Sequence, residues 1–191
     1  KKGGFLNISI TLTTLLVCMM LSVANAGAQS HSDAVTVNIR FFPVQTIAVQ
    51  TTQKSTDLMY ASTEDYEQGV SVTHDDHLTV CSSGGFQITV AADGAYFTRV
   101  GGSETIPLGD VIVRAADGSY SRPHTRYTET PLSSTPSSII ESENGGKDLK
   151  YNVTYDNRIA GSAQNYIDKH VKSDGVETVY KANVTYTITT R

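Results

Sequence analysis

The sequence contains no tryptophan, only 8% aromatic residues and only 18% charged residues. Scarce charge together with abundant Ser, Thr and Val is not the composition of a helical bundle, which is rich in Ala, Leu, Glu and Lys. The formal net charge is -4 and there is no run of Lys and Arg, so the clustered positive charge that nucleic acids require is missing. A length of 191 residues fits one core. The sequence predicts one β-rich domain and no nucleic-acid partner.

Catalytic signatures are also missing. The chain has no Gly-x-Ser-x-Gly elbow, phosphate-binding loop, dinucleotide fingerprint, His-Glu-x-x-His pattern or Cys-x-x-Cys pattern. Paired carboxylates such as Glu64 with Asp65 could serve a glycoside hydrolase, but that activity is defined by the separation of the carboxyl groups in space. A solvated polar face is the simpler interpretation. We therefore expect neither an enzyme nor a cofactor, and a hydrolase is the weakest hypothesis.

One cluster has the residue types of a metal site. His74-Asp75-Asp76-His77 places four potential ligands in succession, with His74 and His77 as the weak candidates. Successive side chains on a strand point to opposite faces, and in a turn they splay apart. The pattern favours a solvated turn between Val72 and Leu78, and we expect no metal site there.

The first 26 residues have the organisation of a secretory signal peptide. Lys1-Lys2 precedes a mostly apolar stretch over residues 5–23, and Ala24-Asn25-Ala26 offers the small residues of a cleavage site. The clean apolar core of residues 15–23 is shorter than the ~20 residues that span a bilayer. We expect cleavage after Ala26, with Ala28 as the alternative, followed by export and no membrane span in the mature chain.

Cysteine is scarce as well. Cys18 lies in the predicted signal peptide, so the mature chain retains only Cys81. Exported proteins often use disulfides, but a single cysteine cannot form one within the chain. No base is visible beside Cys81 in the sequence, which favours an inert small side chain over a nucleophile. Stability is expected to come from packing.

Apolar and polar residues alternate through most of the mature chain, as in half-buried strands. In the first such segment, Val35, Val37, Ile39 and Phe41 share one face, and Pro43 follows them. Frequent Gly and Asp-Gly turn signals separate the later segments. Turn signals at this density are typical of a sandwich or barrel.

Two local patterns in the middle of the chain predict particular structures. Gly84-Gly85 lies between two alternating segments and predicts a hairpin with positive φ at the glycines. The polar stretch from Ser62 to Gly69 predicts one helical turn, capped by Ser62 or Thr63.

The end of the chain has the clearest alternation. Residues 180–190 alternate without an error, which predicts one continuous strand of roughly 35 Å. The apolar positions form its expected core face: Tyr180, Ala182, Val184, Tyr186 and Ile188.

Both ends of the mature chain resemble exported pilins of the chaperone/usher type, in particular the alternate, colonisation-factor-like class. Those pilins begin with an alternating apolar strand that runs into a proline and end with a tyrosine-led alternating strand. The matching segments here are residues 35–43 and 180–189. The resemblance implies an all-β fold, a single immunoglobulin-like antiparallel β-sandwich over residues 44–191, preceded by an N-terminal extension over residues 27–43.

The resemblance also implies a way of assembling. The extension would be a donor strand, and its residues Val35, Val37, Ile39 and Phe41 would complete the sandwich of the next copy in a surface filament (pilus or fimbrium). The implied partners are copies of the chain itself, a periplasmic chaperone and an outer-membrane assembly protein, and the protein would reach the cell surface through the periplasm.

Two alternatives stay open. Residues 34–41 could be the first strand of a self-complete sandwich. The protein would then be a secreted monomeric β-sandwich binding module, or an adhesin for a glycan or host protein. The small secreted β-sandwich surface proteins share the same terminal pattern.

Overall fold

The computed structural model describes residues 31–163, 166–171 and 176–191. The expected signal peptide and Cys18 lie outside the described residues. The chain divides into two units, residues Lys1–Arg40 and Phe41–Arg191. In the first unit, residues 31–40 form neither helix nor strand, and their side chains are exposed.

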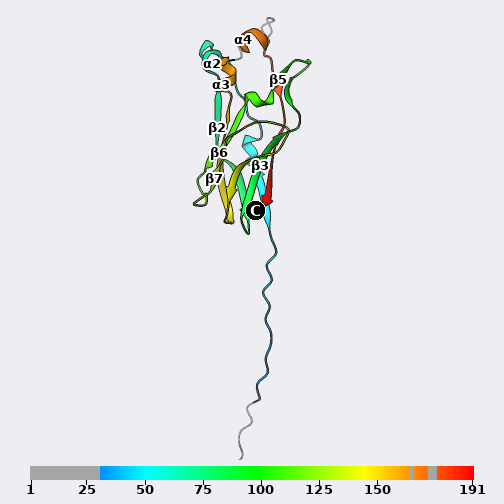
Figure 1. Ribbon diagram of the computed structural model, residues 1–191, viewed down its shortest axis with the longest axis vertical. Helices are drawn as coiled ribbons and strands as arrows, with labels where there is room; N and C mark the ends of the chain where they lie inside the picture. The colour runs from blue at the N-terminus through cyan, green and yellow to red at the C-terminus, as the bar shows by residue number, and fades with distance from the viewer. Residues whose placement is uncertain (1–30, 164–165, 172–175) are drawn as a thin grey trace, which may run out of the picture. The chain divides into compact units, whose positions relative to one another are not determined.

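Two larger antiparallel sheets and one small sheet make up the second unit (Figure 1). The five-stranded sheet contains, in order, β1 (Gln45–Val49), β2 (Ser71–Ser82), β10 (Gly146–Asp156), β6 (Ile112–Asp117) and β8 (Thr130–Pro131). The four-stranded sheet contains β12 (Val184–Thr190), β3 (Phe86–Ala92), β9 (Ser137–Ser142) and β7 (Arg126–Tyr127). The small sheet contains β11 (Tyr180–Lys181), β4 (Tyr96–Arg99) and β5 (Thr105–Pro107).

The core fills the space between the two larger sheets. Alternate side chains of the facing strands are buried there, including Leu78, Val80, Phe86, Ile88, Ile140, Leu149, Tyr151 and Val153. Phe86 and Tyr151 meet across the sheets with ring centroids 6.3 Å apart. Each fully buried side chain of this size contributes ~1.5–3 kcal/mol. The predicted all-β antiparallel sandwich is confirmed.

Three short helices gather at one end of the second unit (Figure 1): α2 (Thr63–Gln68), α3 (Arg158–Ala163) and α4 (Tyr166–Lys169). We call this the helical end. The helical turn at Ser62–Gly69 is confirmed, because Ser62 and Asp65 form a reciprocal capping box and Gly69, with φ of 70°, ends the helix. Two 3-10 turns complete the elements, η1 (Thr51–Gln53) and η2 (Leu108–Asp110).

The opposite end of the second unit holds the connection between β2 and β3. Here Gln45 pairs with Ser82, and the backbone N–H of Arg191 donates to the carbonyl of Gly85. We call this end the base. It marks the start of β1 and the end of β12.

The Gly84-Gly85 hairpin was a wrong prediction. β2 and β3 belong to different sheets, so the connection carries the chain from one layer to the other. Neither glycine has a positive φ. Gly85 is required by a close approach instead, because a Cβ there would lie 2.9 Å from the carbonyl oxygen of Glu143.

The continuous C-terminal strand is also interrupted. β11 pairs with β4, whereas β12 pairs with β3, and Ala182 and Asn183 separate the two. Asn183 is held at the break by Asp93, whose carboxylate accepts hydrogen bonds from its backbone N–H at 3.2 Å and its side-chain amide at 2.6 Å. The last part of the chain therefore contributes to two sheets.

Candidate functional site

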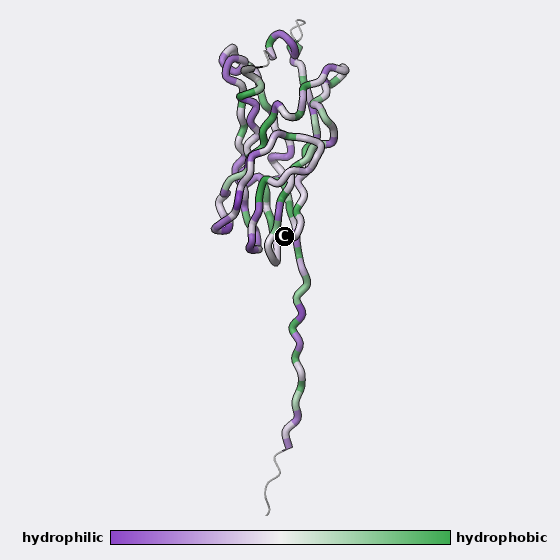
Figure 2. Tube along the Cα trace, viewed as in Figure 1, coloured by the Kyte–Doolittle hydropathy of each residue, from purple (hydrophilic) through white to green (hydrophobic). Residues whose placement is uncertain are grey.

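The candidate donor residues are exposed. The exposed fractions of Val35, Val37, Ile39 and Phe41 are 87%, 79%, 77% and 89%. In Figure 2, hydrophobic and hydrophilic residues alternate along this part of the chain. No helix or strand includes these residues. Four large apolar side chains at alternate positions thus lack the cover that would stabilise them.

β1 and β12 are edge strands of the two larger sheets, whose other edge strands, β8 and β7, have only two residues each. Within the described residues, β1 pairs only with β2, and β12 pairs only with β3. The two strands lie beside each other at matching edges of the two larger sheets. The second edge of each strand therefore carries backbone N–H and C=O groups with no ladder partner, which is the arrangement that an added strand pairs with.

The inward side chains of these two edge strands are only half-buried. They are Ile47, Val49, Val184, Tyr186 and Ile188, which we call the acceptor edge. By contrast, Val80, Ile88 and Val90 on the neighbouring central strands have exposed fractions of 2% or less. The core is therefore less completely covered along the acceptor edge than at its centre.

All five expected C-terminal core residues are half-buried, but they do not lie on one continuous strand. Val184, Tyr186 and Ile188 lie on β12, Tyr180 lies on β11, and Ala182 lies between them. Only the three residues of β12 share the open edge with β1.

The segment His74-Asp75-Asp76-His77 lies inside β2 and is not a solvated turn. A bulge opposite Asn152 shifts the register, with Asp76 at a φ of 51° and its N–H donating to the Asn152 side chain. Three residues of β2, from Asp75 to His77, lie opposite Asn152 alone, and within this bulge the side chain of His77 is buried, with an exposed fraction of 2%.

Both candidate metal ligands have other partners. The rings of His74 and His77 are stacked with centroids 5.1 Å apart. Nδ1 of His77 lies 3.0 Å from Gln53 Oε1, and Nε2 of His74 lies 2.9 Å from Thr56 Oγ1. Desolvation, and secondly the charge of His74, lower the pKa of His77 to about 4. No group of three or more His, Cys, Asp or Glu side chains in the described ranges is arranged to hold a metal ion.

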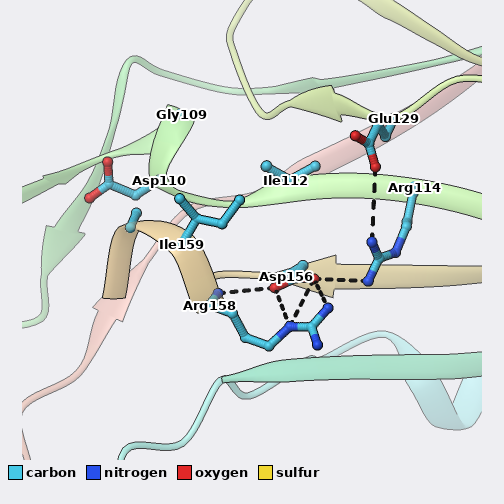
Figure 3. Close-up of a pocket in the computed structure, with 9 residues that line it drawn as sticks. Gly109, Asp110, Ile112, Arg114, Glu129, Asp156, Arg158 and Ile159 are labelled. Atoms are coloured by element: carbon cyan, nitrogen blue, oxygen red, sulfur yellow. Dashed lines mark hydrogen bonds and ion pairs between the residues drawn. The ribbon is translucent and has the colours of Figure 1, made fainter. Parts of the chain in front are cut away.

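A separate cavity of about 370 Å³ opens on the outer face of the five-stranded sheet near the helical end (Figure 3). Charged side chains supply most of its polar lining: Asp110, Arg114, Glu129, Asp156 and Arg158. Ile112 and Ile159 give it an apolar side. The combination resembles that of polar ligand pockets, which mix apolar walls with a few placed polar groups.

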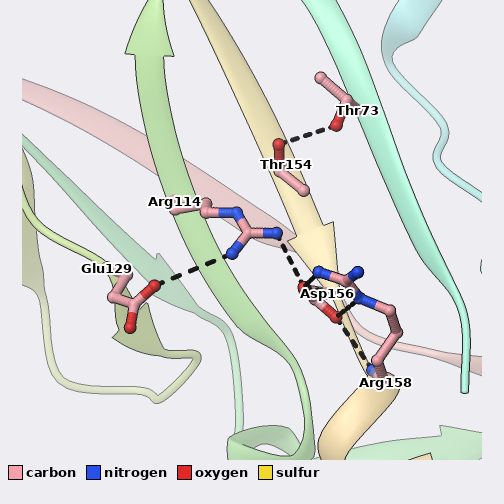
Figure 4. Close-up of polar contacts among 6 residues, drawn as sticks. All are labelled: Thr73, Arg114, Glu129, Thr154, Asp156 and Arg158. Atoms are coloured by element: carbon pink, nitrogen blue, oxygen red, sulfur yellow. Dashed lines mark hydrogen bonds and ion pairs between the residues drawn. The ribbon is translucent and has the colours of Figure 1, made fainter.

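A chain of ion pairs crosses this cavity (Figure 4). Arg114 lies 3.9 Å from Glu129 and donates to Asp156 at 2.8 Å, while Nε of Arg158 donates to both Asp156 oxygens at 3.0 and 3.1 Å. The bonds from Arg158 are the main reason that the pKa of Asp156 falls to about 2. The backbone N–H of Arg158 also bonds Asp156, which fixes the start of α3.

Sequence reasoning missed this cavity. Arg114 and Asp156 are 42 residues apart and meet only because β6 pairs with β10. The one local signal was the charge of Asp156 at the end of an otherwise alternating segment.

Comparison with known proteins adds no family: no protein-family model matches the chain, and no curated protein matches it significantly. No helix in the described part of the chain has both the length and the apolar character needed to cross a membrane. Cys81 is a free, half-buried thiol on β2.

Proposed function

We propose that this chain is a structural subunit of a bacterial surface filament that assembles by strand exchange. Residues 35–41 of one copy would occupy the acceptor edge of the next copy, along the free edge of β12 and beside β1. One observation carries the proposal: the chain has both a row of four exposed, alternating apolar side chains and a half-covered apolar edge formed by two strands that each pair on one side only.

The two partners of this exchange match in length and chemistry. The segment from Val35 to Phe41 has seven residues, as many as β12, and spans roughly 23 Å when extended. Its backbone would complete the ladder of β12, and its four apolar side chains would cover the half-buried row. This pairing would cover the exposed apolar segment and would also supply a ladder partner for the open edge.

The test uses the full chain produced through the secretory route of a bacterium, with and without Ile39→Asp plus Phe41→Asp. The matched control is Thr36→Asp plus Asn38→Asp, which adds the same charge on the polar face. We expect polymers from the wild type and the control, and a folded monomer from the Ile39/Phe41 variant. Circular dichroism and size-exclusion chromatography measure the two properties.

The opposite result has a clear meaning. If the Ile39/Phe41 variant unfolds while the control stays folded, these side chains belong to the core of their own sandwich. If the wild type forms no polymer, strand exchange is not its function.

A second candidate function, recognition of a glycan, is favoured by the cavity of Figure 3. Its guanidinium and carboxylate groups offer donors and acceptors close to an apolar wall, which suits the hydroxyl groups and C–H faces of a saccharide. Titration of methyl glycosides followed by NMR tests it. Shifts that Glu129→Ala and Ile112→Ala abolish support this function, and the absence of shifts rejects it for those sugars.

A further inference from the structure

The directions of the edge strands determine how neighbouring copies would meet. β1 starts at the base, where Gln45 pairs with Ser82, and runs toward the helical end. β12 runs the opposite way, from Val184 opposite Ala92 to Thr190 opposite Phe86 at the base. A strand added along this edge is therefore antiparallel to one of them and parallel to the other.

Pairing antiparallel to β12 is the better solution for a strand from another copy. β12 offers seven residues and β1 only five, antiparallel ladders are slightly more stable per residue, and every ladder in the described residues is antiparallel. If the segment inserted into its own copy, it would instead pair antiparallel to β1. Residues 35–41 are joined to β1 through residues 42–44 alone, so a fold-back would run antiparallel to β1.

The short connection then brings two domains together. With the donor antiparallel to β12, Phe41 lies beside Val184, on the side of the acceptor nearer its helical end. The chain must enter the base of its own domain at Gln45, four residues later, which is at most about 14 Å away. The base of the donor copy is thus held against the upper part of the acceptor copy.

We propose that the helical end is a second contact surface, covered in the filament by the base of the next copy of this chain. This inference rests on the proposed strand exchange. The contact is heterologous, because a base meets a helical end, and such contacts generate open filaments when the rotation does not close.

Exposed apolar side chains are present on both sides of this junction. On the donor side, Phe42 and Val44 have exposed fractions of 78% and 53%. On the acceptor side, Met59 precedes α2 and Ile167 lies on α4, with exposed fractions of 67% and 53%. Burying these side chains at the junction would add to the stabilisation that the donor strand provides by itself.

The acceptor side of the junction is a packed platform. The Tyr60 ring lies 5.1 Å from that of Tyr66 and 5.5 Å from that of Tyr166, which joins the segment before α2 to both α2 and α4. The Tyr166 hydroxyl donates to Asp110 at 2.7 Å, which ties α4 to η2. Met59 and Ile167 therefore belong to elements that hold one another in place.

Cross-linking in mixed polymers tests the contact. All chains carry Cys81→Ser; one population carries Val44→Cys and a second carries Met59→Cys. A bismaleimide with a reach of about 14 Å, the span of the connection, should link the two populations in polymers and not in monomers. The matched control replaces Met59→Cys by Gly84→Cys at the base, which is exposed with nothing within 4 Å of an added Cβ.

Three outcomes separate the two proposals. Links to the Met59 position without links to the Gly84 position support the contact. Polymers that link only through the Gly84 position overturn it and indicate a donor antiparallel to β1, while strand exchange itself stands. If the wild type forms no polymer, both proposals fail.

A second variant measures the strength of the contact. Met59→Asp with Ile167→Asp leaves the donor segment and the acceptor edge intact, so polymers should still form. They should dissociate roughly tenfold faster in denaturant than wild-type polymers, a change equivalent to one lost interaction of moderate strength. An unchanged dissociation rate, with circular dichroism confirming a folded variant, overturns the contact.

Discussion

The ring of Tyr186 on β12 packs edge-on against the buried imidazole of His77 on β2, with centroids 5.8 Å apart and ring planes at 77°. This contact joins an open edge strand of one sheet to the interior of the other. Tyr155 on β10 contacts the same imidazole and shares a hydrogen bond with the Tyr186 hydroxyl. The protonation state of His77 therefore bears directly on the acceptor edge.

Stability should fall in mild acid because of His77. Its pKa is about 4 in the folded chain and 6.5 when unfolded, so the unfolded chain binds more protons between these values. The free energy of unfolding is then highest above pH 6.5 and decreases as the pH falls toward 4, by up to about 3 kcal/mol. Urea unfolding at pH 7.5, 5.5 and 4.5 measures this.

A control separates His77 from the other histidine with a lowered pKa. Burial also lowers the pKa of His170, which acts in the same direction. His77→Gln should remove most of the loss between pH 6.5 and 4, and His170→Gln should retain most of it. Equal profiles for the two variants would show that the burial of His77 does not control this dependence.

The sequence predicted the strands where the signal was local. A period of two assigns the faces of Val184, Tyr186 and Ile188 correctly, because each side chain depends only on its place in the strand. The break at Asn183 could not be predicted, since it depends on hydrogen bonds to Asp93, which is 90 residues away in the chain.

The layer change after β2 and the burial of His77 have a similar cause. Ser82-Ser83-Gly84-Gly85 is compatible with a hairpin or with a corner, and the packing of the two sheets decides between them. His77 is buried within the bulge of β2, where the N–H of Asp76 donates to the side chain of Asn152 on another strand. Local patterns predict elements, but contacts between distant elements decide their pairing and the polar sites.

Asp156 should stabilise the fold through its two arginines. Asp156→Asn weakens the bonds from Arg114 and Arg158 and should lower the free energy of unfolding at pH 7 by about 2 kcal/mol. The pKa of Asp156 is about 2, below its usual 3.8, so this stabilisation is present above pH 3.8 and lost as the pH falls toward 2. The difference between variant and wild type should shrink over that range.

Glu129→Gln is the matched control for the same cluster. The side chain of Glu129 is 67% exposed and lies 3.9 Å from Arg114, so its removal should change stability by less than about 0.5 kcal/mol. Chemical denaturation of both variants at pH 7 makes the comparison. Equal losses would mean that the burial of Asp156 adds nothing to its ion pairs.

The acceptor edge makes a prediction about the monomer and the filament together. Val184→Asp puts a charge on the half-buried face of β12 and should cost the monomer about 1–3 kcal/mol, whereas Thr185→Asp on the exposed face should cost less than about 0.5 kcal/mol. In a filament the donor strand would cover the Val184 position and remove its remaining access to water. Val184→Asp should therefore weaken polymers by more than it weakens the monomer, and Thr185→Asp should weaken neither. Urea unfolding of monomers and of polymers gives the two quantities, and an equal effect of Val184→Asp on both would mean that no donor strand covers this edge.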